Sequence, residues 1–270
     1  MYLATDNSTR PIVQLVGEIN HSDFRDAVSL LQADCELVGQ TVSSPELIVA
    51  AQARPGTICR HEIERLRRQA PLAGAVALLG SWCEGETRTG RPWPGVERQY
   101  WYEFPAWWRR QMALRATGRC PDWARPPDFG FRIADFGLRT ELCRKSGLII
   151  LRIARRETAD ALADVFHRAG YATAWQPPGT SAVRVRGAVA GIWEGGQLDD
   201  SESADLAAFC RQIAGDRAPV VALLDFPRRD RVARALEIGA ASVLGKPWLN
   251  TDLLATLQTL ANKTDLARAA

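Results

Sequence analysis

The stretch that decides the fold runs from Pro219 to Trp248 and reads PVVALLDFPRRDRVARALEIGAASVLGKPW. It opens on an apolar run, residues 219–224, of the kind that fills a buried parallel strand. Apolar residues then recur at helical spacing over residues 229–238 and stop at Gly239, and a second apolar run covers residues 242–244. A strand, a helix and a strand in this order predict a crossover between neighbouring parallel strands.

The same alternation extends toward the middle of the chain. Apolar runs predict further strands, and amphipathic segments predict helices between them. The expected strands are 148–153, 171–175 and 188–193, and the expected helices are 157–169, 203–214 and a last one that begins at Asn250 or Thr251. Strands that alternate with helices call for a parallel sheet covered by helices on both faces.

The first half of the chain repeats this order. The expected strands are 12–17, 36–40, 45–52, 73–79 and a short one at 100–102, and the expected helices are 23–32, 61–69 and 107–116. Both halves leave little room for a helix between the second and third strands. The shared order predicts two similar domains in tandem.

The opening stretch resembles the receiver domain of response regulators. In that family a fourth strand is followed by a helix, a Gly-Ala pair, a short strand and Lys-Pro, which here are Gly239-Ala240, residues 242–244 and Lys246-Pro247. The resemblance spans residues 147–262, and the pattern of the first half extends it. It implies an α/β chain of two flavodoxin-like, doubly wound, parallel-sheet domains: residues 1–117, a connector at 118–146, and residues 147–270.

The sequence departs from receivers at their reactive positions. The resemblance implies Mg²⁺-binding acidic residues after the first strand, where this chain has Ile153-Ala154-Arg155-Arg156. It implies a phosphoacceptor Asp at the end of the third strand, where the candidates are Ile192, Trp193 and Glu194. Phosphoryl transfer needs a carboxylate nucleophile and a metal ion, so we expect degenerate receivers without metal or cofactor.

Two further family positions complete this comparison. The switch Thr or Ser at the end of the fourth strand corresponds to Leu224, and in the first half Ala51 or Gln52 stands where the Asp belongs. Lys246 and Pro247 remain, and we interpret them as a structural remnant of the receiver site.

Residues 80–104, GSWCEGETRTGRPWPGVERQYWYEF, have neither a helical nor a strand period. We interpret them as a Gly/Pro-rich loop that replaces the fourth helix of the first domain, with Phe104-Pro105 where Lys-Pro belongs. Ligands of open parallel sheets collect beyond the carboxyl ends of the strands, and this loop begins there. The candidate binding residues are Trp82, Cys83, Glu84, Glu86, Arg88, Arg91, Trp93, Arg98 and Trp101.

Four interpretations of this loop stay open. Trp and Arg are the usual anchors of protein interfaces, and the arginines could instead hold a small anionic ligand. The Trp residues could also plug the gap left by the missing helix, with the two Glu pairing with the arginines as a lid. Last, Cys83 could be the nucleophile of a thiol enzyme, with His21 or His61 as its base.

Composition narrows the class of protein. Hydrophobic residues make up 46% and charged residues 24%, as in globular proteins, and no apolar run is long enough to span a membrane. A net charge of +3 without a concentrated basic face argues against nucleic-acid binding. The six cysteines have no metal-binding spacing, and no secretory signal is evident, so we expect a cytoplasmic protein. The leading hypothesis is a non-catalytic, receiver-like signalling or scaffold protein that binds another protein independently of phosphorylation.

Overall fold

The computed structural model describes residues 10–39, 44–86, 90, 92–124, 147–180, 187–214 and 218–269. The chain divides into two compact units, Met1–Arg132 and Ile133–Ala270. The division falls within the predicted connector 118–146, most of which lies outside the described residues. Among the helices that are described, none is long and apolar enough to cross a membrane.

The first unit contains five strands and their connecting helices. Its strands are β1 Ile12–Gly17, β2 Glu36–Val38, β3 Leu47–Gln52, β4 Gly74–Leu79 and β5 Glu97–Tyr100. Its α-helices are α1 Arg25–Asp34, α2 Arg60–Gln69 and α4 Phe104–Ala116, and its short 3₁₀ helices are η1 Ser22–Phe24, η2 Ser81–Cys83 and η3 Asp122–Ala124.

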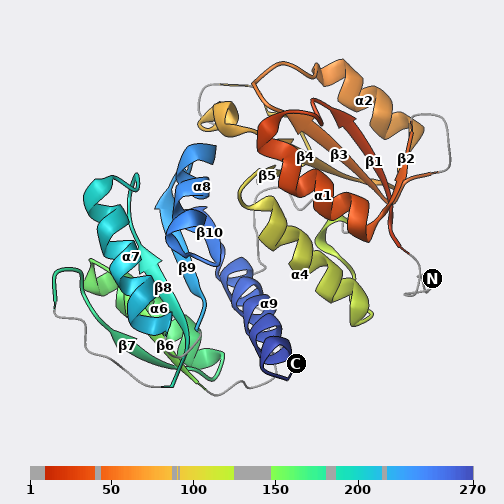
Figure 1. Ribbon diagram of the computed structural model, residues 1–270. Coiled ribbons are helices and arrows are strands. Elements are labelled where there is room, and N and C mark those ends of the chain that lie inside the picture. The colour runs from red at the N-terminus through yellow and green to blue at the C-terminus, as the bar shows by residue number, and fades with distance from the viewer. Residues whose placement is uncertain are drawn as a thin grey trace. The chain divides into compact units, whose positions relative to one another are not determined.

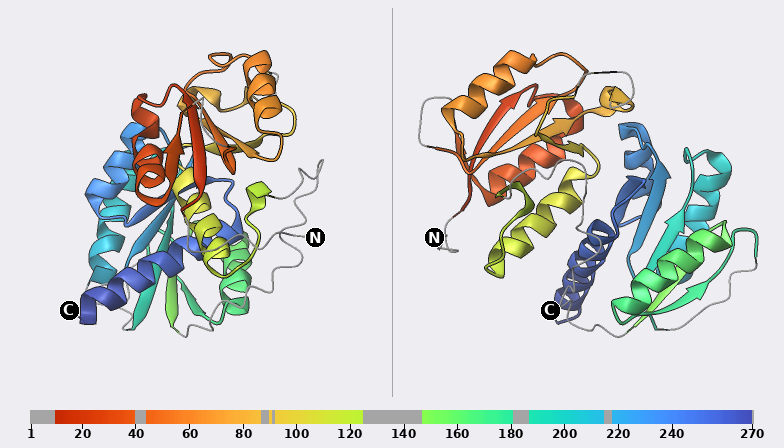
Figure 2. Two further views of the ribbon diagram at one scale, coloured as in Figure 1. Left: turned by 90° about the vertical axis from the view of Figure 1, so that its right-hand side faces the viewer. Right: turned by 180° about the vertical axis from the view of Figure 1, so that it is seen from behind.

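All pairings in the first sheet are parallel, and the strand order is β2-β1-β3-β4-β5. Strand β3 lies in the centre, and all six of its residues, LIVAAQ, are buried. A continuous apolar run is what a strand covered on both faces requires. The helix α2 covers one face of this sheet, and α1 and α4 lie side by side on the other (Figures 1 and 2).

The second unit repeats the plan. Its strands are β6 Leu148–Arg152, β7 Ala172–Trp175, β8 Ala188–Glu194, β9 Val220–Asp225 and β10 Ser242–Lys246. Its helices are α6 Arg156–Arg168, α7 Asp200–Ala214, α8 Arg229–Ile238 and α9 Asn250–Ala269.

The second sheet is also parallel throughout, with the order β10-β9-β8-β6-β7. Helices α7 and α8 share a core with one face of the sheet, and α9 lies on the side of the sheet away from α7 (Figures 1 and 2). Counted within each unit, both sheets have the order 2-1-3-4-5, which is the flavodoxin-like doubly wound arrangement. The expected fold class is therefore confirmed: two flavodoxin-like α/β domains in tandem.

The end of the first unit differs from the sequence prediction. The edge strand was expected at residues 100–102, but β5 ends at Tyr100, where it pairs with Leu79. Phe104 and Pro105 therefore lie beyond the end of the strand, whereas in the second unit Lys246 ends β10 and Pro247 follows it directly. They form the first turn of α4, where a proline's missing N–H costs nothing.

Candidate functional site

The loops at the carboxyl edge of the first sheet are tied to one another. The Glu18 carboxylate, after β1, accepts a hydrogen bond of 2.8 Å from the amide N–H of Ala53, after β3. The carboxylate of Asp23 accepts hydrogen bonds from the N–H and hydroxyl of Ser81, after β4, at 2.9 and 3.0 Å. Gly80 approaches the Ala53 backbone so closely that a Cβ on Gly80 would lie 2.8 Å from it. These contacts hold three loops as one rigid platform.

Trp82 stands exposed on this platform. Its relative exposure is 63%, and the guanidinium carbon of Arg54 lies 5.5 Å from the centre of its ring. This distance is typical of a cation–π contact. We call these two residues the Trp82–Arg54 pair.

The other two tryptophans of the 80–104 loop are covered. Trp93 is partly buried. Together with Val96 it packs against two hydrophobic clusters, one between the sheet and α2 and the other formed by β4 and Cys83. Trp101 is only 3% exposed. Among the described residues from 80 to 96, the helical positions are η2 and Glu86, whose carbonyl oxygen accepts a hydrogen bond of 2.7 Å from the N–H of Gly90. Trp93 and Trp101 are therefore covered, whereas Trp82 is exposed.

A buried polar cluster lies beneath the platform. The Gln52 side-chain N–H₂ lies 3.5 Å from Glu86 Oε1 and 3.9 Å from Cys83 Sγ. Cys83 in turn donates to the main-chain oxygen of Gln52 at 3.3 Å. Arg98 pairs with the other oxygen of Glu86 at 2.8 Å. A pairing of this kind, between a Glu and an Arg of the loop, is part of the lid interpretation. Gln52 thus joins the end of β3 to the loop.

The surroundings of Cys83 oppose a catalytic role. The side chain is fully buried, and its hydrogen bonds go to Gln52. Burial, followed by the nearby Glu86 carboxylate, raises the pKa of the Cys83 thiol to about 11. A thiol nucleophile needs the opposite shift and access to substrate.

The three arginines of the 80–104 loop differ in what the structure describes of them. Arg98 is mostly buried and its charge is matched by Glu86, so it does not present a free guanidinium to an anionic ligand. Arg88 and Arg91 lie outside the described residues. Glu84 is partly buried and lies beside the exposed Gly85.

Ion pairs fill the carboxyl edge of the second sheet. The Lys246 ammonium, at the end of β10, lies 2.9 Å from Asp225 Oδ1 and 3.4 Å from Glu194 Oε1. These carboxylates end β9 and β8. The peptide bond between Lys246 and Pro247 is cis. Lys246 is therefore matched by two carboxylates from the neighbouring strand ends.

A second polar network lies at the end of β6. The buried Arg152 side chain pairs with Asp205 of α7, its Nε lying 3.3 Å from Oδ2, and the Trp193 ring N–H donates to the same oxygen at 2.8 Å. Burial alone would raise the pKa of the Asp205 carboxyl, but the hydrogen bonds from Arg152 and Trp193 hold this pKa below its usual value. Arg155 and Arg156, which follow the strand, are exposed.

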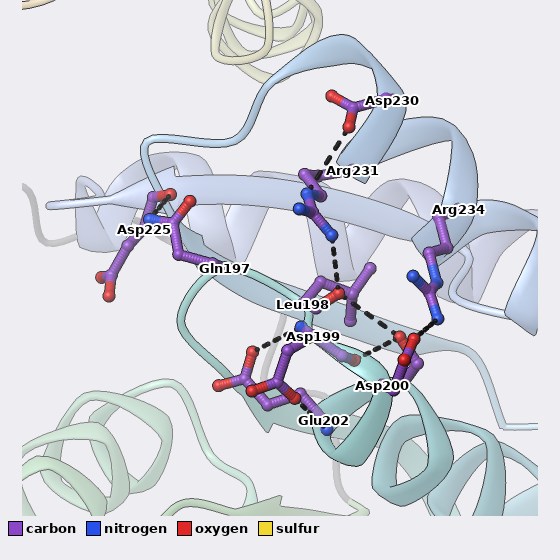
Figure 3. Close-up of polar contacts among 10 residues, drawn as sticks. Gln197, Leu198, Asp199, Asp200, Glu202, Asp225, Asp230, Arg231 and Arg234 are labelled. Carbon is purple, nitrogen blue, oxygen red and sulfur yellow. Dashed lines mark hydrogen bonds and ion pairs between the residues drawn. The ribbon is translucent and has the colours of Figure 1, made fainter.

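Figure 3 shows how the loop between β8 and α7 is held. The N–H of Glu202 donates to the Asp199 carboxylate at 2.8 Å, and the N–H of Asp199 donates back to the Glu202 carboxylate at 3.3 Å, which forms a capping box. Leu198 is buried with a φ of 55°, and Arg231 of α8 donates to its carbonyl oxygen at 3.1 Å. Arg234 pairs with Asp200 at 2.8 Å.

The sequence analysis missed several of these residues. Arg152 and Asp225 were not chosen, Gln52 was considered only as a replaced Asp, and Arg54 was not considered. Three of the four share one signal: each is a polar residue that ends a buried apolar run, as in LIILR, VVALLD and LIVAAQ. Arg54 carries no comparable signal, because its contact with Trp82 joins loops that are distant in sequence.

Known proteins resemble the chain in structure. No protein-family model and no curated protein matches it. The solved structures that match include the receiver domain of a Francisella response regulator, with 14% identity over 44% of this chain and 98% of that one and a TM-score of 0.37. They also include the receiver domain of a histidine kinase from Syntrophus aciditrophicus, with 24% identity over 43% of this chain and 91% of that one and a TM-score of 0.36.

A receiver protein from Pseudoalteromonas atlantica matches in the same way, with 18% identity over 43% of this chain and 98% of that one and a TM-score of 0.36. Each of these three matches covers less than half of the chain. The fold assignment itself rests on the strand order of the two sheets. The three matching structures are receiver domains or receiver proteins, and these are what the chain is similar to.

Proposed function

We propose that the chain is a receiver-like signalling or scaffold protein that acts by binding another protein, without phosphoryl transfer at its own sheet edges. The observation that carries this proposal is the exposed Trp82 on a platform of three cross-tied loops. Large aromatic side chains on preorganised surfaces are the usual anchors of protein interfaces.

The second sheet edge supports action without phosphorylation. Lys246 is engaged by Glu194 and Asp225, so an incoming phosphoryl group would have to displace two carboxylates from it. The neighbouring loop after β6 carries Arg155 and Arg156 in place of metal-binding acids. Oxygen ligands, carboxylates above all, are what Mg²⁺ requires.

The first sheet edge supports the same conclusion. Gln52 ends the central strand β3, and its side-chain amide is bound to Glu86 in the buried cluster. An amide is not a nucleophile for phosphoryl transfer, and the cluster leaves its carboxylate, Glu86, paired with Arg98.

Incubation with acetyl phosphate and Mg²⁺, followed by intact-protein mass spectrometry, tests the absence of phosphorylation. We expect no mass increase of one phosphoryl group, and the same result for Glu194→Gln. A stable phospho-form of the wild type that Glu194→Gln or Asp225→Asn abolishes would overturn the phosphorylation-independent part of the proposal.

Affinity capture from the lysate of the native host tests the binding role. We expect a protein that the wild type enriches and that Trp82→Ala loses at least tenfold. Leu72→Ala is the matched control, because Leu72 is 97% exposed in the same unit and lies away from the platform loops in sequence. Equal enrichment by all three proteins would remove Trp82 from the proposal.

We also propose a cytoplasmic location. Cys35, Cys59, Cys83, Cys120 and Cys210 are free thiols in the structure. Two of them, Cys59 and Cys120, are exposed, and free surface thiols persist in reducing compartments. Fractionation of the native host with an antibody to the chain tests this location.

A further inference from the structure

We infer that the Trp82–Arg54 pair is a docking anchor for a peptide segment that carries a carboxylate next to a bulky apolar side chain. This inference rests on the proposed role in protein binding and specifies the chemistry of the partner. It follows from three features of the platform: the exposure of the indole, the charge left on Arg54, and the internal use of the surrounding carboxylates.

The first feature is an exposed aromatic ring in a rigid setting. Trp82 follows Ser81, which is tied to Asp23, and its ring contacts Arg54, which follows Ala53, tied to Glu18. A partner that covers this ring gains apolar burial without first having to order the loops. The apolar half of the partner's segment is therefore a bulky side chain that packs on the indole.

The second feature is the unmatched charge of Arg54. Within the described residues, the guanidinium of Arg54 contacts the Trp82 ring and has no carboxylate partner. Two other exposed arginines, Arg60 and Arg156, do have one: Arg60 pairs with Glu64 at 2.7 Å, and Arg156 pairs with Asp160 at 3.5 Å. A guanidinium offers a planar fork of donors that matches a carboxylate, so Arg54 supplies the charged half of the anchor.

The third feature is that the acidic groups of the platform are engaged internally. Glu18 accepts from Ala53, and Asp23 accepts from Ser81. They leave Arg54 as the platform's charge for a partner, and they lie in the neighbouring loop. A single carboxylate in a peptide satisfies Arg54 alone, whereas the repeated phosphates of a nucleic-acid strand would also meet the carboxylate of the partly exposed Glu18. The arrangement therefore favours an acidic peptide over a single-stranded nucleic acid.

Selection from a displayed library of random dodecapeptides against the full chain tests this inference. The wild type, Trp82→Ala and Arg54→Gln are compared with two matched controls, Leu72→Ala and Arg60→Gln. Trp82, Arg54, Leu72 and Arg60 are all exposed. Thermal unfolding of every variant verifies that it is folded, and binding of fluorescein-labelled dT10 is measured in parallel.

We expect the wild type and both controls to select peptides with Asp or Glu near Phe, Leu, Ile or Trp. A synthetic peptide from this pool should bind Trp82→Ala and Arg54→Gln at least tenfold more weakly than the wild type. Replacing its carboxylate by the amide should weaken binding to the wild type about as much as Arg54→Gln does.

Three results would overturn the inference. One is a pool that Trp82→Ala selects equally well, and another is a pool without acidic residues. The third is binding of dT10 that depends on Trp82. Each of these results leaves the broader proposal standing if capture from lysate still depends on Trp82. If peptide binding depends on Trp82 but capture from lysate does not, the anchor is separate from the surface that binds the cellular partner.

Discussion

The two units have the same strand order but fill the carboxyl edge of the sheet with different chemistry. In the first unit the edge holds a buried cluster around Gln52 and Cys83 and an exposed tryptophan above it. In the second unit the edge holds ion pairs, Lys246 with Glu194 and Asp225 and Arg152 with Asp205. The first edge therefore offers an apolar surface, and the second is matched internally.

The last helices differ in a related way. Helix α4 of the first unit stacks aromatic rings, with Trp108 lying between Phe104 at 6.1 Å and Trp123 at 5.3 Å between ring centres. Helix α9 of the second unit buries leucines, Leu253 and Leu257. The same strand order is thus combined with two different sets of core residues and two different sets of side chains at the carboxyl edge of the sheet. This is why the fold alone does not assign a function.

The largest expected effect breaks the aromatic core of the first unit. Trp108 is fully buried, and its ring N–H donates to Asp34 at 2.9 Å. Trp108→Ala should lower the free energy of unfolding by about 3–5 kcal/mol. Hydrogen exchange, read separately for β1–β5 and β6–β10, should show the loss in the first sheet and little change in the second. Equal loss in both sheets would contradict the view that each unit has its own core.

The next effect breaks the ion-pair edge of the second unit. Arg152→Met leaves the Asp205 carboxylate with Trp193 as its remaining donor and should cost about 2–3 kcal/mol in urea unfolding, below the range for fully buried pairs because Asp205 is partly exposed. The matched control is Arg156→Met, which removes an exposed pair and should change stability by less than about 0.5 kcal/mol. Similar losses in both variants would mean that Arg152 contributes no more than a surface charge.

The third effect concerns thiol reactivity at the first edge. The raised pKa of Cys83 leaves the thiol protonated at pH 8, and burial also shields it. We expect Cys83 to react with iodoacetamide at least about a hundredfold more slowly than the exposed Cys59 in the native protein. Peptide mass spectrometry measures the rates, and unfolding in guanidinium is the control that should equalise them. Comparable native rates would restore the thiol-enzyme interpretation.

The pH dependence of stability should separate the two units further. Because the pKa of Asp205 is lower in the folded protein, its contribution is present at neutral pH. This contribution is lost as the pH falls from the ordinary carboxyl pKa of about 3.9 through the folded value. Asp205→Asn should therefore make unfolding less dependent on acid below about pH 4, as followed by circular dichroism. An unchanged acid profile would show that the ionised Asp205 does not stabilise the fold.

The smallest expected effect is at the Trp82–Arg54 pair itself. A double-mutant cycle with Trp82→Ala and Arg54→Ala should give a coupling energy of no more than about 0.5–1 kcal/mol in unfolding, because the pair is exposed. Chemical denaturation of the four proteins measures it. A coupling of several kcal/mol would make the pair a structural element and would weaken its role as a binding anchor.

The sequence predicted the periodic part of the molecule well. Continuous apolar runs such as residues 47–52 and 220–224 are typical of buried parallel strands, and both are strands. The helix over residues 229–238 has the bounds that its spacing and Gly239 indicate. The edge strand β5, ERQY, was misplaced by about three residues. An edge strand is half exposed, so its pattern is weaker than that of the aromatic residues that follow it.

The sequence alone therefore determined the order of strands and helices and the tandem repeat, because these depend on local periodicity and on glycine and proline. Only the tertiary structure decided which of three similar tryptophans is exposed, and which cations are matched. Trp82, Trp93 and Trp101 differ in exposure because of what packs on them. Arg54 and Arg98 differ because the folded loops bring Glu86 to Arg98 and the Trp82 ring to Arg54. Burial and charge pairing are properties of contacts between distant segments, and no local pattern encodes them.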